Sequence, residues 1–316
     1  MMNLIRFRLK RYIYRWETFT AALVNIITGC LSGTLLLSLY RDINRPGIED
    51  YFFPAAFMLS LFCTMSAVII TEDNNISNGA VRNQLIAGYT KTKIYASTFI
   101  TVFIYSIVQG LFMTVPLYIF GNGSFNTELS DKYKICLLIS LILMYSAVSC
   151  LAVTVSVLSG RKSITVLICT TAVAGLTFAG MYADKRLDTS KYHYKEKYYV
   201  WEDSGGIIEK VDFIKNKNML YVGGHSRDAL EQFVRFDPMK PVFDFSEWYF
   251  SDRHKVKSID EQMYERSPQY AAETDDKMAL YDSHTHRLLL FPYYQAAFIA
   301  LIGAVSLIAF RKRSIK

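Results

Sequence analysis

Charged side chains are missing from six long stretches of this sequence. Neither Asp, Glu, Lys, Arg nor His occurs in residues 18–40, 52–71, 94–120, 135–158, 164–183 and 291–310. About 20 apolar residues suffice to cross roughly 30 Å of hydrocarbon, so each stretch is long enough to span a membrane. With 52% hydrophobic residues and a mean hydropathy of +0.17, the chain is too apolar for a soluble protein of this size. We predict an all-α membrane protein with six transmembrane helices.

Cysteine is absent from the segment 184–290, because all five cysteines lie within the apolar stretches. This segment must therefore fold without disulfides. Its aromatic start and a Gly-rich turn predict a hairpin, and a helix capped by Ser226 is predicted to end before Pro238. A second helix is predicted around 258–266. We predict a small extracellular α+β domain, inserted between the fifth and sixth transmembrane helices.

The net charge of +7 is unevenly distributed. Residues 184–290 hold 17 Lys and Arg against 20 Asp and Glu, so the positive charge lies near the ends of the apolar stretches. This pattern excludes nucleic-acid binding as the main function and instead sets the topology. With the N-terminus inside, the inner segments carry fourteen Lys and Arg and the short outer loops carry four. We predict a multi-pass protein of the plasma membrane with both termini in the cytoplasm.

The N-terminal residues 2–16 form a basic amphipathic pattern, in which one helical face is apolar and the other carries arginines. Two interpretations stay open, an interfacial helix in the headgroup layer and a simple basic flank of the first span. The first apolar stretch is longer than a signal-peptide core and lacks a clear cleavage site, which favours a retained span. The apolar face is Ile5, Leu9, Tyr12, Ile13 and Trp16, and the basic face is Arg8, Arg11 and Arg15.

Several chemical motifs are missing as well. The sequence has neither a phosphate-binding loop of the G-x-x-x-x-G-K-[ST] type nor an H-E-x-x-H motif. No ionisable residue lies within the six stretches, which disfavours proton- or sodium-driven transport. Asn25 and Gln109 are the notable polar side chains there, and hydrogen bonds between helices explain them as well as a role in transport does. His284 and His286 alternate as on a strand, but no third ligand is evident. We predict no catalytic residues, no metal site and no cofactor.

Residues 72–97 contain the most informative motif. Val81, Leu85 and Tyr89 recur every four residues, with Arg82 off their face, which predicts a short amphipathic helix. Gly88 is a natural C-terminal stop for that helix. A helix of this kind at the cytoplasmic surface is a docking site for a partner, and the alternative interpretation is a solvated loop.

This motif resembles the permease subunits of ABC exporters of the type-two class. Members of that family commonly have an acidic residue after the second span, followed by a Gly, an apolar helix, and a Gly with hydroxyl and basic residues. The end of the chain, GAVSLIAFRKRSIK, also resembles the usual close of the family. Ala80 and Thr98 depart from the residues that are frequent there. The matching residues are Glu72, Gly79, Arg82, Leu85, Gly88, Thr90, Lys91 and Ser97.

The resemblance implies a function. The short helix would be the coupling helix that docks on a separate ATP-binding subunit, and the permease would work as a homodimer or heterodimer in the lipid bilayer. We expect export of an amphipathic or hydrophobic substrate, with a peptide as the first candidate. The alternative is a membrane-anchored sensor whose extracellular domain binds a ligand without transport. The implied coupling residues are Gly79, Val81, Arg82, Leu85, Gly88 and Tyr89.

The predicted organisation has three parts. Residues 1–183 form the membrane domain with an N-terminal interfacial helix and five spans, residues 184–290 form the extracellular domain, and residues 291–316 form the sixth span with a basic cytoplasmic tail.

Overall fold

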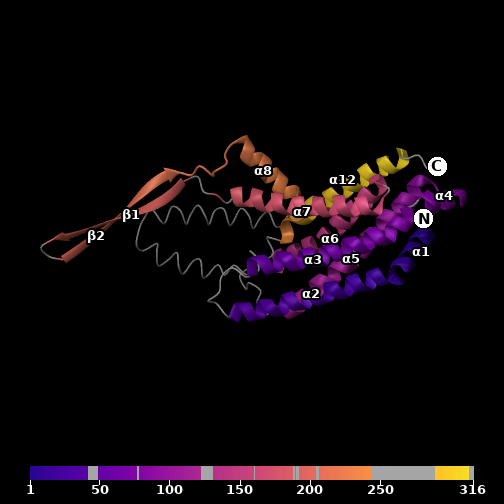
Figure 1. Cartoon of the computed structure of the whole chain (residues 1–316), viewed down its shortest axis with the longest axis horizontal. Helices are drawn as coiled ribbons and strands as arrows, with labels where there is room; N and C mark the ends of the chain where they lie inside the picture. The colour runs from indigo at the N-terminus through magenta and orange to yellow at the C-terminus, as the bar shows by residue number, and fades with distance from the viewer. Residues whose placement is uncertain are drawn as a thin grey trace.

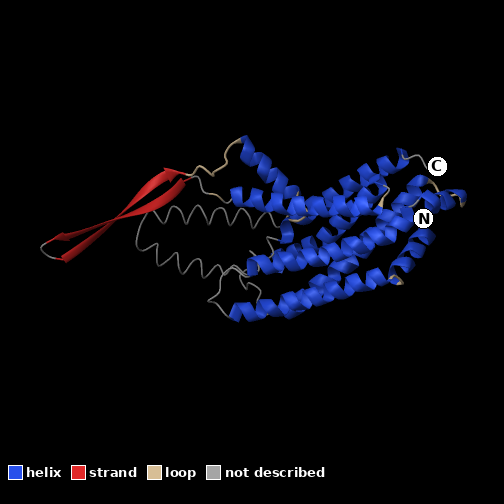
Figure 2. Ribbon diagram, in the orientation of Figure 1, coloured by secondary structure: helices blue, strands red, loops and turns tan. Residues whose placement is uncertain are grey.

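The protein is dominated by long helices (Figures 1 and 2). The computed structural model describes residues 1–41, 49–76, 78–121, 131–159, 161–187, 189, 192–203, 206–242 and 289–312. The elements are α1 (Met2–Ile13), α2 (Trp16–Arg41), α3 (Glu49–Ile76), α4 (Asn78–Ile86), α5 (Lys91–Gly121), α6 (Asp131–Ser159), α7 (Lys162–Leu187), β1 (Tyr192–Asp203), β2 (Gly206–Lys217), α8 (His225–Phe236) and α12 (Phe291–Lys312).

Among the described residues, five helices are long and apolar enough to cross a membrane. They lie in α3, α5, α6, α7 and α12, which confirms a multi-pass helical membrane protein. The 26-residue helix α2 falls outside this set, so the sixth span stays a prediction. Its placement favours that prediction, because α2 packs along α3 and α5.

The helices place the predicted inner segments together. In Figure 1 both termini and α4 lie at one end of the bundle, and the strands β1 and β2 extend from the opposite end. A chain whose two ends meet at one side of a bundle crosses it an even number of times. Six passes by α2, α3, α5, α6, α7 and α12 satisfy this condition.

Close contacts between backbones hold α2 against α5. A Cβ atom added at Gly29 would clash with the carbonyl oxygen of Met113, and one at Gly33 would lie 2.7 Å from Cβ of Phe120. Two glycines four residues apart allow membrane helices to approach this closely. Pro116 lies near this contact, and α5 continues through it as one helix to Gly121.

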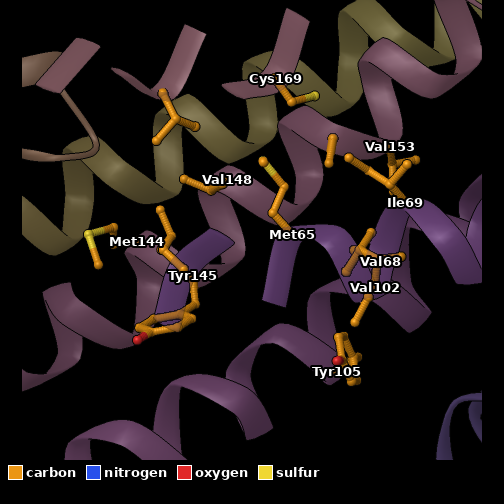
Figure 3. Close-up of a cluster of buried hydrophobic side chains, with 14 of the residues drawn as sticks. Met65, Val68, Ile69, Val102, Tyr105, Met144, Tyr145, Val148, Val153 and Cys169 are labelled. Atoms are coloured by element: carbon orange, nitrogen blue, oxygen red, sulfur yellow. The ribbon is translucent and has the colours of Figure 1, made fainter. Parts of the chain in front are cut away.

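The core is formed mainly by α3, α5 and α6. Figure 3 shows Met65 and Val68 from α3, Val102 from α5 and Val148 from α6 in one buried cluster. Each of these side chains is at most 3% exposed. Because apolar burial drives no association within lipid, tight packing of such side chains carries the stability of the bundle.

The segment after α7 begins with the predicted hairpin. The strands β1 and β2 pair antiparallel, with Asp203 opposite Gly206 at the turn. The helix α8 also forms, but the expected cap at Ser226 is wrong. The N-cap is Gly224, whose φ of 63° favours glycine, and no side chain caps the helix. The predicted helix at 258–266 lies outside the described residues.

The helix α8 packs back onto the bundle. Val234 forms a small cluster with Ala183 and Leu187 of α7. The helix α7 itself ends at Leu187, four residues past the predicted boundary at residue 183. Beyond α8, Lys240 forms an ion pair with Asp184. The described part of segment 184–290 is therefore fastened to α7 at the end of the bundle that carries the hairpin.

Candidate coupling site

The helix α4 is short and ends in a defined turn. Gly88 has a φ of 85°, its N–H donates to the carbonyl of Leu85, and the N–H of Tyr89 donates to the carbonyl of Gln84 at 3.1 Å. This pair of hydrogen bonds is the Schellman motif, and its left-handed residue favours glycine. Thr90 then accepts a hydrogen bond from the N–H of Lys93 at the start of α5. The helix stop that the sequence predicted at Gly88 is confirmed.

The side chains of α4 divide between the bundle and solvent. Val81 is 2% exposed within the main core, and Leu85 and Tyr89 are half-buried against the same core. On the other side, Arg82 is exposed and Ile86 is 76% exposed. The apolar residues grouped by the sequence therefore attach α4 to its own chain. Gly79 lies at the start of α4.

The helix α1 buries a different face from the one that the sequence predicted. Arg8 is 1% exposed and packs with Leu4, Ile5 and Tyr12 on the buried side, whereas Ile13 is 72% exposed. The assignment of Arg8 to an outward basic face was wrong. The physical reason is a buried carboxylate that pairs with its guanidinium.

That carboxylate is Glu72, near the end of α3. Nη1 of Arg8 lies 3.1 Å from Oε2 of Glu72, and Nη2 donates to Oε1 of Gln84 at 3.2 Å. Three elements, α1, α3 and α4, are thus joined by one guanidinium. We call Arg8, Tyr12, Glu72 and Gln84 the Arg8 cluster.

Burial and charge act against each other in the Arg8 cluster. Burial lowers the pKa of Arg8, and the negative charge of Glu72 partly offsets this effect. Burial also raises the pKa of Tyr12 well above its usual value, and the nearby Glu72 raises it further. A buried carboxylate is tolerated here because a cation faces it at hydrogen-bonding distance. The pair is therefore charged, and each ion depends on the other.

An aromatic contact and a hydrogen-bonded end connect this region to α5 and α12. The rings of Tyr12 and Tyr105 lie 4.5 Å apart between centroids. At the other side, Nε of Arg311 donates to Oγ1 of Thr92 at 3.1 Å, and Nζ of Lys91 donates to the carbonyl of Arg311. The basic end of α12 therefore lies beside the start of α5, close to the turn that ends α4.

A second polar cluster lies within the bundle and is neutral. Nδ2 of Asn25 donates to Oε1 of Gln109 at 2.7 Å and to Oγ1 of Thr64 at 3.0 Å. Ser60 donates to Oδ1 of Asn25 and also contacts the hydroxyl of Tyr145. The predicted role of Asn25 and Gln109 in hydrogen bonds between helices is confirmed. We call these five residues the Asn25 cluster.

Among the described residues, no group of three or more His, Cys, Asp and Glu side chains could hold a metal ion. His225 lies exposed at the start of α8, where Nδ1 is 3.9 Å from a carboxylate oxygen of Asp228. His284 and His286 lie outside the described residues. The geometry described here thus provides contacts between helices and a surface at one end of the bundle.

Comparison with known proteins gives one match. The family model of the ABC-2 family transporter proteins matches residues 41–191, a range that contains α4 and its flanking helices α3 and α5. No curated protein and no solved structure matches the chain significantly. The family match confirms the resemblance to type-two ABC permeases. Residues 41–191 of this chain are thus similar to the ABC-2 family of transporter proteins, which supports an ABC-2 type permease subunit.

Proposed function

We propose that the chain is the membrane-spanning permease of an ATP-driven exporter, powered by a separate ATP-binding subunit. The observation that carries the proposal is the family match across residues 41–191. Permeases of this family usually work with such a subunit. The sequence has no phosphate-binding loop of its own, which supports a separate source of energy.

The proposed docking surface is the exposed side of α4. Arg82 and Ile86 face solvent, and Ile86 offers an apolar anchor of the kind that fills a pocket at an interface. Val81 holds α4 on the bundle, Gly88 ends it, and the exposed parts of Leu85 and Tyr89 extend the surface. Gly79, at the start of α4, belongs to the proposed coupling residues.

The Arg8 cluster is the proposed link between this surface and the spans. A movement of α4 displaces Gln84, which is hydrogen-bonded to Arg8, and Arg8 is paired with Glu72 at the end of α3. Because packed helices shift as rigid elements, docking and release of the ATPase would move α1 and α3 together. The permease is proposed to work as a dimer.

The proposed substrate is amphipathic or hydrophobic, with a peptide as the first candidate. The Asn25 cluster supports this class, because its five side chains are neutral and hydrogen-bond to one another. A strongly charged solute crossing the bundle would need compensating charges there. The proposed direction is outward.

The orientation is proposed from the excess of Lys and Arg in the predicted inner segments. A cysteine at Ser226, exposed in α8, should react with an impermeant thiol reagent in intact cells. A cysteine at Lys162, exposed at the start of α7, should react only after the membrane is opened. The opposite labelling pattern would place the termini outside the cell and remove the docking surface from the cytoplasm.

The test of the function is retention of the ATPase on the purified permease. The full-length chain is purified from its native membranes, and co-purifying ATP-binding subunits are quantified by mass spectrometry. Loss of an anchoring side chain at an interface centre costs about 2 kcal/mol or more, which is more than tenfold in affinity. The combined variant Arg82→Glu with Ile86→Asp should therefore lose most of the bound ATPase.

The matched control is Lys162→Glu, which reverses an exposed charge at the same end of the bundle without touching α4. It should retain the ATPase at the wild-type level. Both variants should reach the membrane in normal amounts, because neither changes an apolar span. Undiminished ATPase on the α4 variant would refute the docking surface, and the absence of any ATPase on the wild-type chain would refute the permease proposal.

A further inference from the structure

A groove opens between α1, α2 and α5. It encloses a cavity of about 500 Å³, which lies within the range of roughly 300–1,000 Å³ that is usual for small-molecule sites. It is lined by Leu9, Tyr12, Ile13, Thr18, Phe19 and Ala22, and by further residues of α2 and α5 that include Leu23, Val108, Gln109 and Phe112.

The walls of the groove fit a hydrocarbon chain better than a polar solute. Nine of the thirteen lining side chains are wholly apolar, and the amide oxygen of Gln109 already accepts a hydrogen bond from Asn25. Phe19, Leu23 and Val108 are 58%, 46% and 40% exposed, so the groove opens outward along the spans. At that depth an open apolar groove faces the hydrocarbon of the membrane.

Two cations lie on α1 near the residues that this helix contributes to the groove. Leu9 and Ile13 line the groove, and Arg6 and Lys10 lie three residues before Leu9 and Ile13 respectively, both exposed on α1. Residues at these spacings share one helical face. Arg8, in contrast, points to the buried side and pairs with Glu72. The same face of α1 thus offers two exposed basic side chains near an apolar cavity.

We propose that this groove binds one acyl chain of an anionic glycerophospholipid, whose phosphate is held by Arg6 and Lys10. The apolar cavity takes the chain, and the two cations take the headgroup at the edge of the membrane. The site lies in the leaflet that contains α1. It rests on the membrane location of the protein and is independent of the proposed transport function.

Charge also argues for a lipid over a second copy of the chain in the groove. A symmetric dimer contact uses the same patch on both subunits, so it would bring Arg6 and Lys10 of both copies, four cations, into one interface. Like charges gathered in this way repel one another. An anionic lipid presents the opposite charge and an alkyl chain in one molecule, which matches both halves of the site.

The test uses the purified full-length chain in detergent. It is mixed with equal amounts of labelled dioleoylphosphatidylglycerol and dioleoylphosphatidylcholine, and the lipid retained per chain is counted after gel filtration. Each cation near an anionic headgroup is expected to raise the affinity for phosphatidylglycerol about fivefold, and solvent screening removes part of this gain. The wild-type chain should prefer phosphatidylglycerol by about tenfold. Equal retention of the two lipids would overturn the proposal.

Two variants separate the halves of the site. Arg6→Gln with Lys10→Gln should reduce the preference to about twofold or less while the chain still retains lipid. Val108→Trp should fill the groove and reduce retention of both lipids about tenfold. The control Arg161→Gln with Lys162→Gln removes the same charge from the turn between α6 and α7 and should keep the wild-type preference.

Three outcomes contradict the site. If the Arg6 and Lys10 variant keeps its full preference, the headgroup is held elsewhere. If Val108→Trp retains both lipids at the wild-type level, the chains lie outside the groove. If Val108→Trp leaves lipid retention unchanged but turns a dimer into a monomer by light scattering, the groove is an interface between two copies. The thermal unfolding midpoint of each variant shows that a loss of lipid does not arise from misfolding.

Discussion

The two buried polar clusters of this protein differ in charge and in place. The Arg8 cluster lies at the end of the bundle that carries the termini, and an ion pair at 3.1 Å holds it together. The Asn25 cluster lies within the bundle and contains only neutral hydrogen bonds. The Arg8 cluster connects three helices, α1, α3 and α4. The Asn25 cluster connects four, α2, α3, α5 and α6.

The difference teaches how each cluster depends on its members. A buried ion without its partner is costly, because it has lost the hydration that water provided. A neutral hydrogen bond between membrane helices contributes less, since partly unfolded helices find other partners within the lipid. Replacing one ion of the Arg8 cluster should therefore cost most of the folding free energy that the cluster contributes. Each replacement in the Asn25 cluster should instead cost only a small part of what that cluster contributes.

The largest expected effect is that of Arg8→Leu, which leaves Glu72 charged and buried. Breaking a buried pair in this way should cost about 3–5 kcal/mol of folding free energy. The control is Arg15→Leu, whose pair with Glu17 is longer at 3.8 Å and partly exposed, so its loss should cost about 0–1 kcal/mol. Thermal unfolding in detergent measures both losses of stability. Equal losses for Arg8→Leu and Arg15→Leu would mean that burying the Arg8–Glu72 pair adds nothing to the cost of breaking it.

Replacing both partners sharpens the comparison further. The double variant Arg8→Leu with Glu72→Leu removes both ions, and an apolar pair of similar volume is often neutral in such places. It should recover most of the stability that Arg8→Leu loses, which a double-mutant cycle quantifies. It should still impair transport, because Gln84 on α4 loses its connection to α1. If the double variant lost as much folding free energy as the two single variants together, Arg8 and Glu72 would not depend on each other.

A smaller loss is expected in the Asn25 cluster. Asn25→Leu removes hydrogen bonds to Thr64 and Gln109 and should cost about 1–2 kcal/mol. The control on the same helix is Thr34→Val, because the exposed hydroxyl of Thr34 bonds only to carbonyls of its own helix in the contacts described. It should change stability by less than about 0.5 kcal/mol. A loss at Asn25 as large as that at Arg8 would erase the difference between the clusters.

The smallest expected effect tests the turn that positions Gln84. At Gly88 a Cβ atom would meet nothing within 4 Å, but the φ of 85° strains an L-residue. Gly88→Ala should therefore cost about 1 kcal/mol. The control Gly175→Ala also has open space but lies within the helix α7, and it should stabilise the protein by up to about 1 kcal/mol. If both alanine substitutions destabilised the protein, or both stabilised it, the positive φ at Gly88 would not explain the loss at that position.

Much of the fold could be predicted from the sequence because its signals are local. The apolar stretches, the hairpin turn at Asp203 and Gly206, and the stop at Gly88 each depend on residues close together in the chain. Asn25 and Gln109 were recognisable as polar groups among apolar ones, although their pairing across 84 positions was not specified by any pattern.

The candidate site was harder to predict because it depends on distant pairing. The amphipathic pattern of residues 2–16 assigned Arg8, Arg11 and Arg15 to the outward face, since an unpaired cation is costly to bury. Only the position of Glu72, 64 residues further along the chain, makes Arg8 the exception. The same limit applies to α4, where the periodic apolar face packs on its own chain. Ile86, which breaks that period, is instead 76% exposed.

The position of α12 has a consequence for biogenesis. Ile299 packs with Ala147 and Cys150 of α6, and Gly303 lies so close to Phe99 of α5 that an added Cβ would be 2.8 Å from its ring. The ribosome makes these surfaces of α5 and α6 long before it makes α12, because the segment 184–290 is synthesised in between. These surfaces of α5 and α6 therefore remain without this partner until α12 has been made. When α12 packs, it covers them and brings Arg311 beside the start of α5, close to the turn that follows α4.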